Sequence, residues 1–183
     1  FKPINQAIQP YDTDKILEHH FLNSRGAIAR FDRNAIEIRV LDLQECPKAD
    51  VAIAMVMVEV LKWMISNLNL AQLKELHEDD LLIILNETIL AAEEAKIDSI
   101  EFLEVFGLAE KSYTARQIWQ FLVEKVKGNL NKETQETLQL ILTSGSLSTR
   151  ILNALKGDVS EENIFKVYRE LAVCLQENKL FVN

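Results

Sequence analysis

The stretch that decides the fold is Arg25–Pro47, which reads RGAIARFDRNAIEIRVLDLQECP. Apolar and polar residues alternate within 26–31 and again within 35–42, over a background of β-branched side chains, and this alternation is typical of β-strands. Asp32 and Asn34, between the two segments, are residues that favour turns. We therefore predict a β-hairpin over residues 25–42.

The segments on either side of the hairpin carry different signals. Pro47 predicts the start of a helix, because its missing N–H would have no partner in a first turn. The helix predicted at 48–68 is apolar nearly all the way round, which is typical of a helix buried on most sides. Ahead of the hairpin, Pro3 and Pro10 indicate an irregular lead, and apolar residues at helical spacing predict a short helix over 14–22.

Residues beyond 70 predict helices, because residues suited to N-caps precede them and glycines follow many of them. The predicted N-caps are Asp79, Asp98, Thr114, Asn131, Ser146 and Ser160, and the predicted helices span about 70–77, 79–95, 98–106, 114–127, 131–143, 146–156 and 160–177. The predicted fold class is therefore α+β and mainly helical. Residues 1–69 hold the hairpin and the buried helix, and residues 70–183 form a helical bundle.

Composition excludes several classes of protein. Of the 183 residues, 48% are apolar and only five are Gly and three Pro, so the chain is neither disordered nor collagen-like. The net charge of −8 argues against a general electrostatic grip on nucleic acid or on an anionic membrane. We therefore expect neither nucleic acid nor a membrane as a partner.

The termini, the apolar runs and the cysteines bear on location. No apolar run approaches the roughly 18–20 residues that span a bilayer, and the first residues lack the features of a secretory signal. Phe1 in place of an initiator Met suggests a cut made inside a longer protein. Cys46 and Cys174 lie far apart and show no spacing typical of a metal site, so a reducing cytoplasm is the expected compartment.

Arginines gather at the hairpin. Four of the seven in the chain fall within fifteen residues, at Arg25, Arg30, Arg33 and Arg39. A guanidinium suits phosphate and carboxylate oxygens, so one interpretation is an anion site. The alternative is that the arginines pair across the strands with the nearby acids Asp32, Glu37, Asp42 and Glu45.

Glu37 and Arg39 form a pair of special interest. Residues i and i+2 of a strand share one face, so this carboxylate and this guanidinium should project side by side. A carboxylate can hold a hard divalent ion such as Mg²⁺, while a neighbouring arginine neutralises phosphate oxygens, and both features stabilise phosphoryl transfer.

The whole string Arg25–Pro47, followed by an apolar helix, resembles the carboxylate–amine ligase family that includes the glutamate–cysteine ligases of the second bacterial type. Ile36–Arg39 with Asp42 is similar, more distantly, to a strand of glutamine synthetase. The resemblance implies that ATP activates a substrate carboxylate to an acyl phosphate, which an amine then attacks. It also implies Mg²⁺, a glutamate-like acid, an amine such as cysteine, and a place in glutathione biosynthesis.

The resemblance also implies roles for single residues. Glu37 would be a Mg²⁺ ligand, and Arg39 would face the transferred phosphate or the acid substrate. Arg30 and Arg33 would bind nucleotide phosphate or a substrate carboxylate, whereas Arg25 fits a surface ion pair better. The N-terminal part of the catalytic sheet is absent, so we expect a C-terminal fragment that is inactive alone, from a parent that could be a homo-oligomer.

A second hypothesis is a non-catalytic helical interaction module, whose hairpin arginines bind an acidic partner. The ligase hypothesis requires an exposed Glu37 carboxylate on the Arg39 face near a cleft, whereas the interaction module needs Glu37 only to pair an arginine. Two other features favour ordinary roles. His19 and His20 lack a second pair at ligand spacing, and the acidic stretch 71–110 is typical of solvated helical faces.

Overall fold

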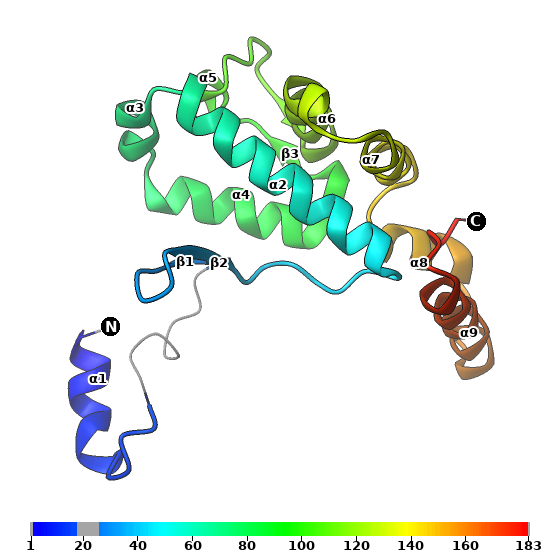
Figure 1. The fold of residues 1–183 in the computed structure, drawn as a ribbon, viewed down its shortest axis with the longest axis horizontal. Coiled ribbons are helices and arrows are strands. Elements are labelled where there is room, and N and C mark those ends of the chain that lie inside the picture. Colours follow the sequence, from blue (N-terminus) through cyan, green and yellow to red (C-terminus); the bar gives the residue numbers. More distant parts are fainter. Residues whose placement is uncertain (1, 18–25, 183) are drawn as a thin grey trace. The chain divides into compact units, whose positions relative to one another are not determined.

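The computed structural model describes residues 2–17 and 26–182, so His19, His20 and Arg25 lie outside the described residues. The chain divides into two compact units, Phe1–Leu43 and Gln44–Asn183 (Figure 1). The fold is mainly helical, with a small two-stranded antiparallel hairpin, and this confirms the predicted α+β class.

The first unit begins with a helix that the sequence did not predict. Helix α1 spans Lys2–Ile8 and the 3-10 helix η1 spans Gln9–Tyr11, each with its proline in the first turn, where a missing N–H costs nothing. The prediction of an irregular lead was wrong for these residues. Residues 14–17 are not helical, so the predicted start of a helix there was also wrong, and its remainder, 18–22, lies outside the described residues.

The predicted hairpin is confirmed. Strand β1 (Ala27–Arg30) pairs antiparallel with β2 (Ala35–Ile38), in the register that sets Ile28 opposite Glu37 and Arg30 opposite Ala35. Asn34 in the turn has φ +48°, a conformation that asparagine tolerates well. The second strand ends at Ile38, earlier than the predicted 42, although the Arg39 N–H still donates to the Gly26 carbonyl at 2.8 Å.

The second unit holds the helices and a short strand pair that the sequence did not predict. The strands are β3 (Lys96–Ile97) and β4 (Tyr113–Thr114), which pair antiparallel. The helices are α2 (Pro47–Asn67), α3 (Leu70–Glu75), α4 (Glu78–Ala91), η3 (Ala92–Glu94), α5 (Ile100–Val105), α6 (Ala115–Val126), η4 (Lys127–Asn129), α7 (Lys132–Ser144), α8 (Leu147–Leu155) and α9 (Glu161–Glu177).

Most of the predicted helix starts are confirmed. The side chains of Thr114, Asn131, Ser146 and Ser160 each accept a hydrogen bond from the first turn of their helix. The predictions at Asp79 and Asp98 were wrong, since the N-caps are His77 and Ser99. Asp79 instead lies in the first turn of α4 with Glu78 and Asp80, where the helix dipole favours carboxylates.

Helix α2 packs against α6 and α7 and forms the centre of the main core (Figure 1). Its buried side carries the small residues Ala49, Ala52, Val56 and Val60, which allow close approach. Its other side exposes Val51, Val58 and Ile65, so α2 is buried along one side rather than on most sides as predicted. Because α2 packs with later helices, it belongs to the second compact unit, Gln44–Asn183.

A smaller core joins α8 and α9 to the C-terminal segment through Leu155, Val167 and Phe181. Among the described residues, no helix combines the length and the apolar character needed to cross a membrane.

Candidate functional site

The candidate site is the polar face of the hairpin. Because cross-strand partners share a face, the register places Arg30 and Glu37 on one side, together with Arg39, which lies opposite Gly26. Arg39 Nε donates to Glu37 Oε1 at 2.8 Å. The pair predicted to project side by side therefore does so.

Glu37 is held from two directions. Its second oxygen, Oε2, accepts a hydrogen bond from Arg30 Nη1 at 2.7 Å, so each carboxylate oxygen contacts a different arginine. These bonds, that from Arg30 first and that from Arg39 second, hold the pKa of Glu37 below its ordinary value. The side chain remains 37% exposed. Glu37 is thus an ionised, oriented carboxylate within reach of solvent.

Arg30 is the residue that organises this face. Its Nε and Nη2 both donate to Asp32, each at 3.1 Å, in the two-pronged geometry typical of an arginine–carboxylate pair. With Nη1 on Glu37, all three guanidinium nitrogens bond to carboxylates, and only 11% of the side chain is exposed. The same bonds raise the pKa of Arg30 and lower that of Asp32. Arg30 is therefore committed to Asp32 and Glu37 rather than presented to a ligand.

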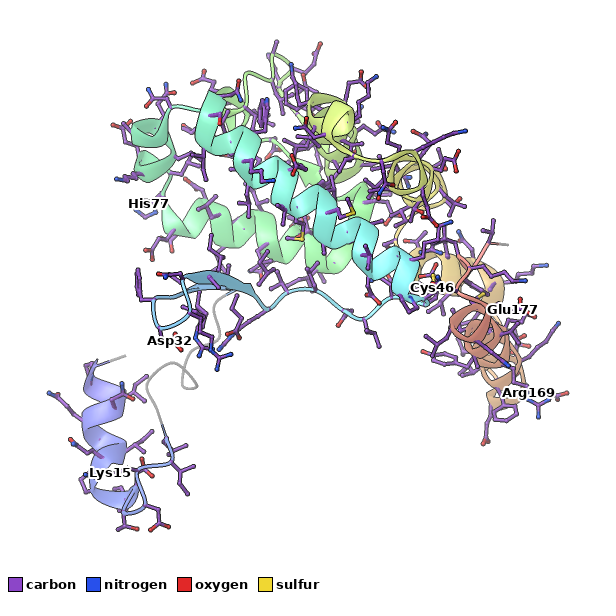
Figure 2. All side chains as sticks on the ribbon, viewed as in Figure 1. Lys15, Asp32, Cys46, His77, Arg169 and Glu177 are labelled. Carbon is purple, nitrogen blue, oxygen red and sulfur yellow. The ribbon has the colours of Figure 1, made fainter. Side chains whose placement is uncertain are left out.

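Arg33 lies in the hairpin turn and differs from Arg30 in exposure. Its side chain is 70% exposed, and its Nε lies 3.4 Å from Asp32 Oδ2. Figure 2 labels Asp32 at this end of the hairpin. Phe31, beside it, is 88% exposed. The turn thus presents a cation and an aromatic ring to solvent.

The hairpin residues alone do not build a magnesium centre. No group of three or more His, Cys, Asp and Glu side chains suited to a metal occurs in the parts of the chain that the structure describes. Glu37 fits the role of one oxygen ligand, since each of its oxygens has a further lone pair. A complete set of ligands would need residues from outside the described part of the chain.

The second unit contains a buried ion pair that the sequence did not predict. Glu45 and Arg150 have side chains 0% and 2% exposed, and Arg150 Nη1 donates to Glu45 Oε1 at 2.5 Å and to the Phe181 carbonyl at 2.7 Å. The Phe181 N–H donates back to Glu45 at 3.0 Å. The expectation that Glu45 pairs with a hairpin arginine was wrong.

Burial acts to raise the pKa of Glu45, but the hydrogen bonds from Arg150 and Phe181 outweigh it, so the pKa lies below its ordinary value. The pair joins the residue two positions before α2 to α8 and to the C-terminal segment, which is a structural role. A local signal for it exists, because Arg150 is the single charge in helix α8, LSTRILNAL.

A second network closes the junction between α7 and α8. Arg116 donates to the Leu142 carbonyl near the end of α7 and to Glu94 at 2.7 Å. Glu93 accepts from the Ser146 N–H at 3.2 Å, at the start of α8. These charged groups satisfy main-chain atoms at two helix ends, so they also serve the fold.

Comparison with known proteins identifies one relative of unstated function. No family model and no solved structure matches the chain. An uncharacterized protein of Archaeoglobus fulgidus is 28% identical over 170 residues, which cover 91% of this chain and 39% of the relative. The chain thus spans about two fifths of the length of that relative.

Proposed function

We propose that this chain is the C-terminal part of an ATP-dependent carboxylate–amine ligase of the glutamate–cysteine ligase type. The observation that carries the proposal is the Glu37–Arg39 pair, held side by side and partly exposed on the polar face of a strand. The resemblance of Arg25–Pro47 to that family supports the same conclusion. The resemblance alone supports a glutamate-like acid, an amine such as cysteine, a homo-oligomeric parent and a cytoplasmic location.

In such a site, Glu37 and Arg39 of the hairpin would have different roles. In the reaction, the terminal phosphoryl group of ATP passes to a substrate carboxylate, and the amine then displaces phosphate from the acyl phosphate. Arg39 supplies positive charge for phosphate or carboxylate oxygens. Glu37 supplies one anionic oxygen, kept ionised by Arg30 and Arg39.

The contacts of Arg30 change the role proposed for it. Since its guanidinium nitrogens bond to Asp32 and Glu37, Arg30 acts as a positioning residue for Glu37 and not as a nucleotide contact. Arg33, which is far more exposed, is the better candidate for a contact with phosphate. Bound Mg²⁺ would neutralise phosphate charge, with Glu37 as one ligand and the others from the rest of the parent protein.

The proposal is tested with a longer protein, obtained by extending the chain upstream in its reading frame. We expect ADP release that depends on both glutamate and cysteine, and a loss of about 100-fold in Glu37→Gln and in Arg39→Ala, because each variant removes a charge facing the reacting groups. Glu136→Gln, an exposed acid on α7, serves as the matched control and should keep the full rate.

Two results would contradict the proposal. Unchanged ADP release in both hairpin variants would remove the roles of Glu37 and Arg39. No substrate-dependent ADP release from a folded longer protein would remove the ligase activity and favour the interaction module. The 183-residue chain alone should release no ADP, since it lacks the rest of the catalytic sheet.

A further inference from the structure

The main-chain hydrogen bonds show which groups of the hairpin point outward. The Arg39 N–H donates to the Gly26 carbonyl, so residues 26 and 39 form a hydrogen-bonded pair. Such pairs recur at every second residue of an antiparallel ladder, so 28/37 and 30/35 are also hydrogen-bonded pairs. The N–H and C=O groups of the residues between them, Ala27, Ala29, Ile36 and Ile38, therefore point away from the partner strand.

The same four residues form the apolar face of the hairpin. Their side chains lie opposite the face of Arg30, Glu37 and Arg39, because faces alternate along a strand. Ile36 is 61% exposed. Within residues 2–17 and 26–182, β1 and β2 pair only with each other. An apolar two-stranded sheet with open edges is marginally stable by itself and is a template for a further strand.

We propose that the open edge of β2, at Ile36 and Ile38, pairs with a β-strand from the part of the longer protein that lies outside these 183 residues. This inference rests on the proposed function, in which the chain is one part of a ligase. The Archaeoglobus fulgidus relative matches this chain over 39% of its own length, so it contains further chain that can supply a strand. The β2 edge is favoured over that of β1 because its outward positions carry isoleucines, which suit strands, and those of β1 carry alanines.

This pairing has a consequence for the candidate site. Strand addition extends the sheet in its own plane, so the added strand does not cover the face that carries Glu37 and Arg39. The added residue opposite Glu37 would occupy the same face, with its Cβ about 4.5–5.5 Å from that of Glu37.

Amide hydrogen exchange tests the pairing without substrate. In the 183-residue chain, we expect the outward N–H groups of Ile36 and Ile38 to exchange fast, and the paired N–H groups of Glu37 and Arg39 to exchange slowly. In the longer protein, exchange at Ile36 and Ile38 should slow by about 100-fold, whereas Ala27 and Ala29 should remain fast. Equal rates at Ile36 and Ile38 in both proteins, or protection of Ala27 and Ala29 instead, would overturn the proposal.

Two single proline variants, one on each edge of the hairpin, provide a second test of the pairing. Ile36→Pro removes one outward N–H and leaves the β1–β2 ladder intact, so the hairpin of the 183-residue chain should keep its slow Arg39 amide. In the longer protein the same variant should restore fast exchange at Ile38. Ala29→Pro, at the cross-strand position on the other edge, is the matched control and should leave Ile38 slow. Slow exchange at Ile38 in Ile36→Pro would contradict the pairing.

The outcomes separate this proposal from the proposed function. Protected Ile36 and Ile38 in a longer protein without ligase activity would keep the strand pairing and remove the ligase. Ligase activity in a longer protein with unprotected Ile36 and Ile38 would keep the ligase and remove the strand pairing. If the 183-residue chain elutes as a dimer with both amides already protected, the partner strand belongs to a second copy, and the proposal is wrong.

Discussion

The hairpin and the helical unit use the same chemical pair, an arginine with a glutamate, in opposite surroundings. The Arg30, Glu37 and Arg39 side chains are 11%, 37% and 25% exposed, so solvent reaches this group in part, whereas Glu45 and Arg150 are sealed from solvent. Exposed pairs contribute little to stability, but breaking a buried pair leaves an uncompensated charge. The partly exposed group is therefore the one available for the binding role proposed above, whereas the buried group holds parts of the fold together.

The largest effect is expected where the buried pair is broken. Arg150→Met leaves the Glu45 carboxylate buried without its partner and should lower the free energy of unfolding by about 3–5 kcal/mol. Urea denaturation followed by circular dichroism measures this change. The exposed acid Glu136, changed to Gln, should leave the midpoint unchanged. A midpoint for Arg150→Met equal to that of the control would show that the pair is not structural.

A second comparison concerns two glycines at positive φ in the helical unit. A Cβ at Gly145 (φ +94°) would clash with Glu93 Oε1, whereas a Cβ at Gly157 (φ +81°) meets nothing within 4 Å. Gly157→Ala should therefore cost about 1–3 kcal/mol of backbone strain. Gly145→Ala should cost a similar backbone strain and about 1–3 kcal/mol more, because the added Cβ would also press on Glu93 and on the less mobile Cβ of Thr149.

The same urea titration compares the two alanine variants directly. If Gly145→Ala were no less stable than Gly157→Ala, the carboxylate of Glu93 would have room to move. The close packing of residue 145 against Glu93, at the α7–α8 junction, would then contribute nothing measurable to stability.

The pH dependence of stability should reflect the low pKa of Glu45. Because this pKa is lower in the folded than in the unfolded chain, the stabilisation is fully present above the unfolded value of about 4.3 and is lost as the pH falls through the folded value. Wild type should therefore lose more stability than Glu45→Gln between neutral and acidic pH. Parallel stability curves for the two proteins would contradict this assignment.

Local patterns in the sequence predicted local structure well. Alternation over 26–31 and 35–42 predicted the hairpin, and Thr114 with Gln117 forms a capping box within a single turn. Pairings between distant residues left no such pattern. Strands β3 and β4 have two residues each, and Glu45 meets Arg150 across 105 positions.

In the candidate site too, local contacts were predicted from the sequence and contacts between strands were less well specified. The i, i+2 spacing predicted that Glu37 and Arg39 share a face. The contact between Arg30 and Glu37 is a diagonal one across the strands, so it depends on a register that the alternation of residues does not specify. The bonds of Arg30 to Asp32 and Glu37 agree with the alternative interpretation of the sequence, in which the hairpin arginines pair with nearby acids.

The smallest effect is expected for Arg30→Gln. Its partners Asp32 and Glu37 are 58% and 37% exposed, so solvent screens these charges more than it screens the sealed Glu45–Arg150 pair, and the loss of stability should be well below that of Arg150→Met. Exchange of the Arg39 amide, which bonds to Gly26, reports whether the hairpin itself opens. Should Arg30→Gln destabilise the protein as much as Arg150→Met, both arginine clusters would be structural. The charges of Arg30, Glu37 and Arg39 would then be explained by their need to hold the strands together, and they would no longer support a binding role.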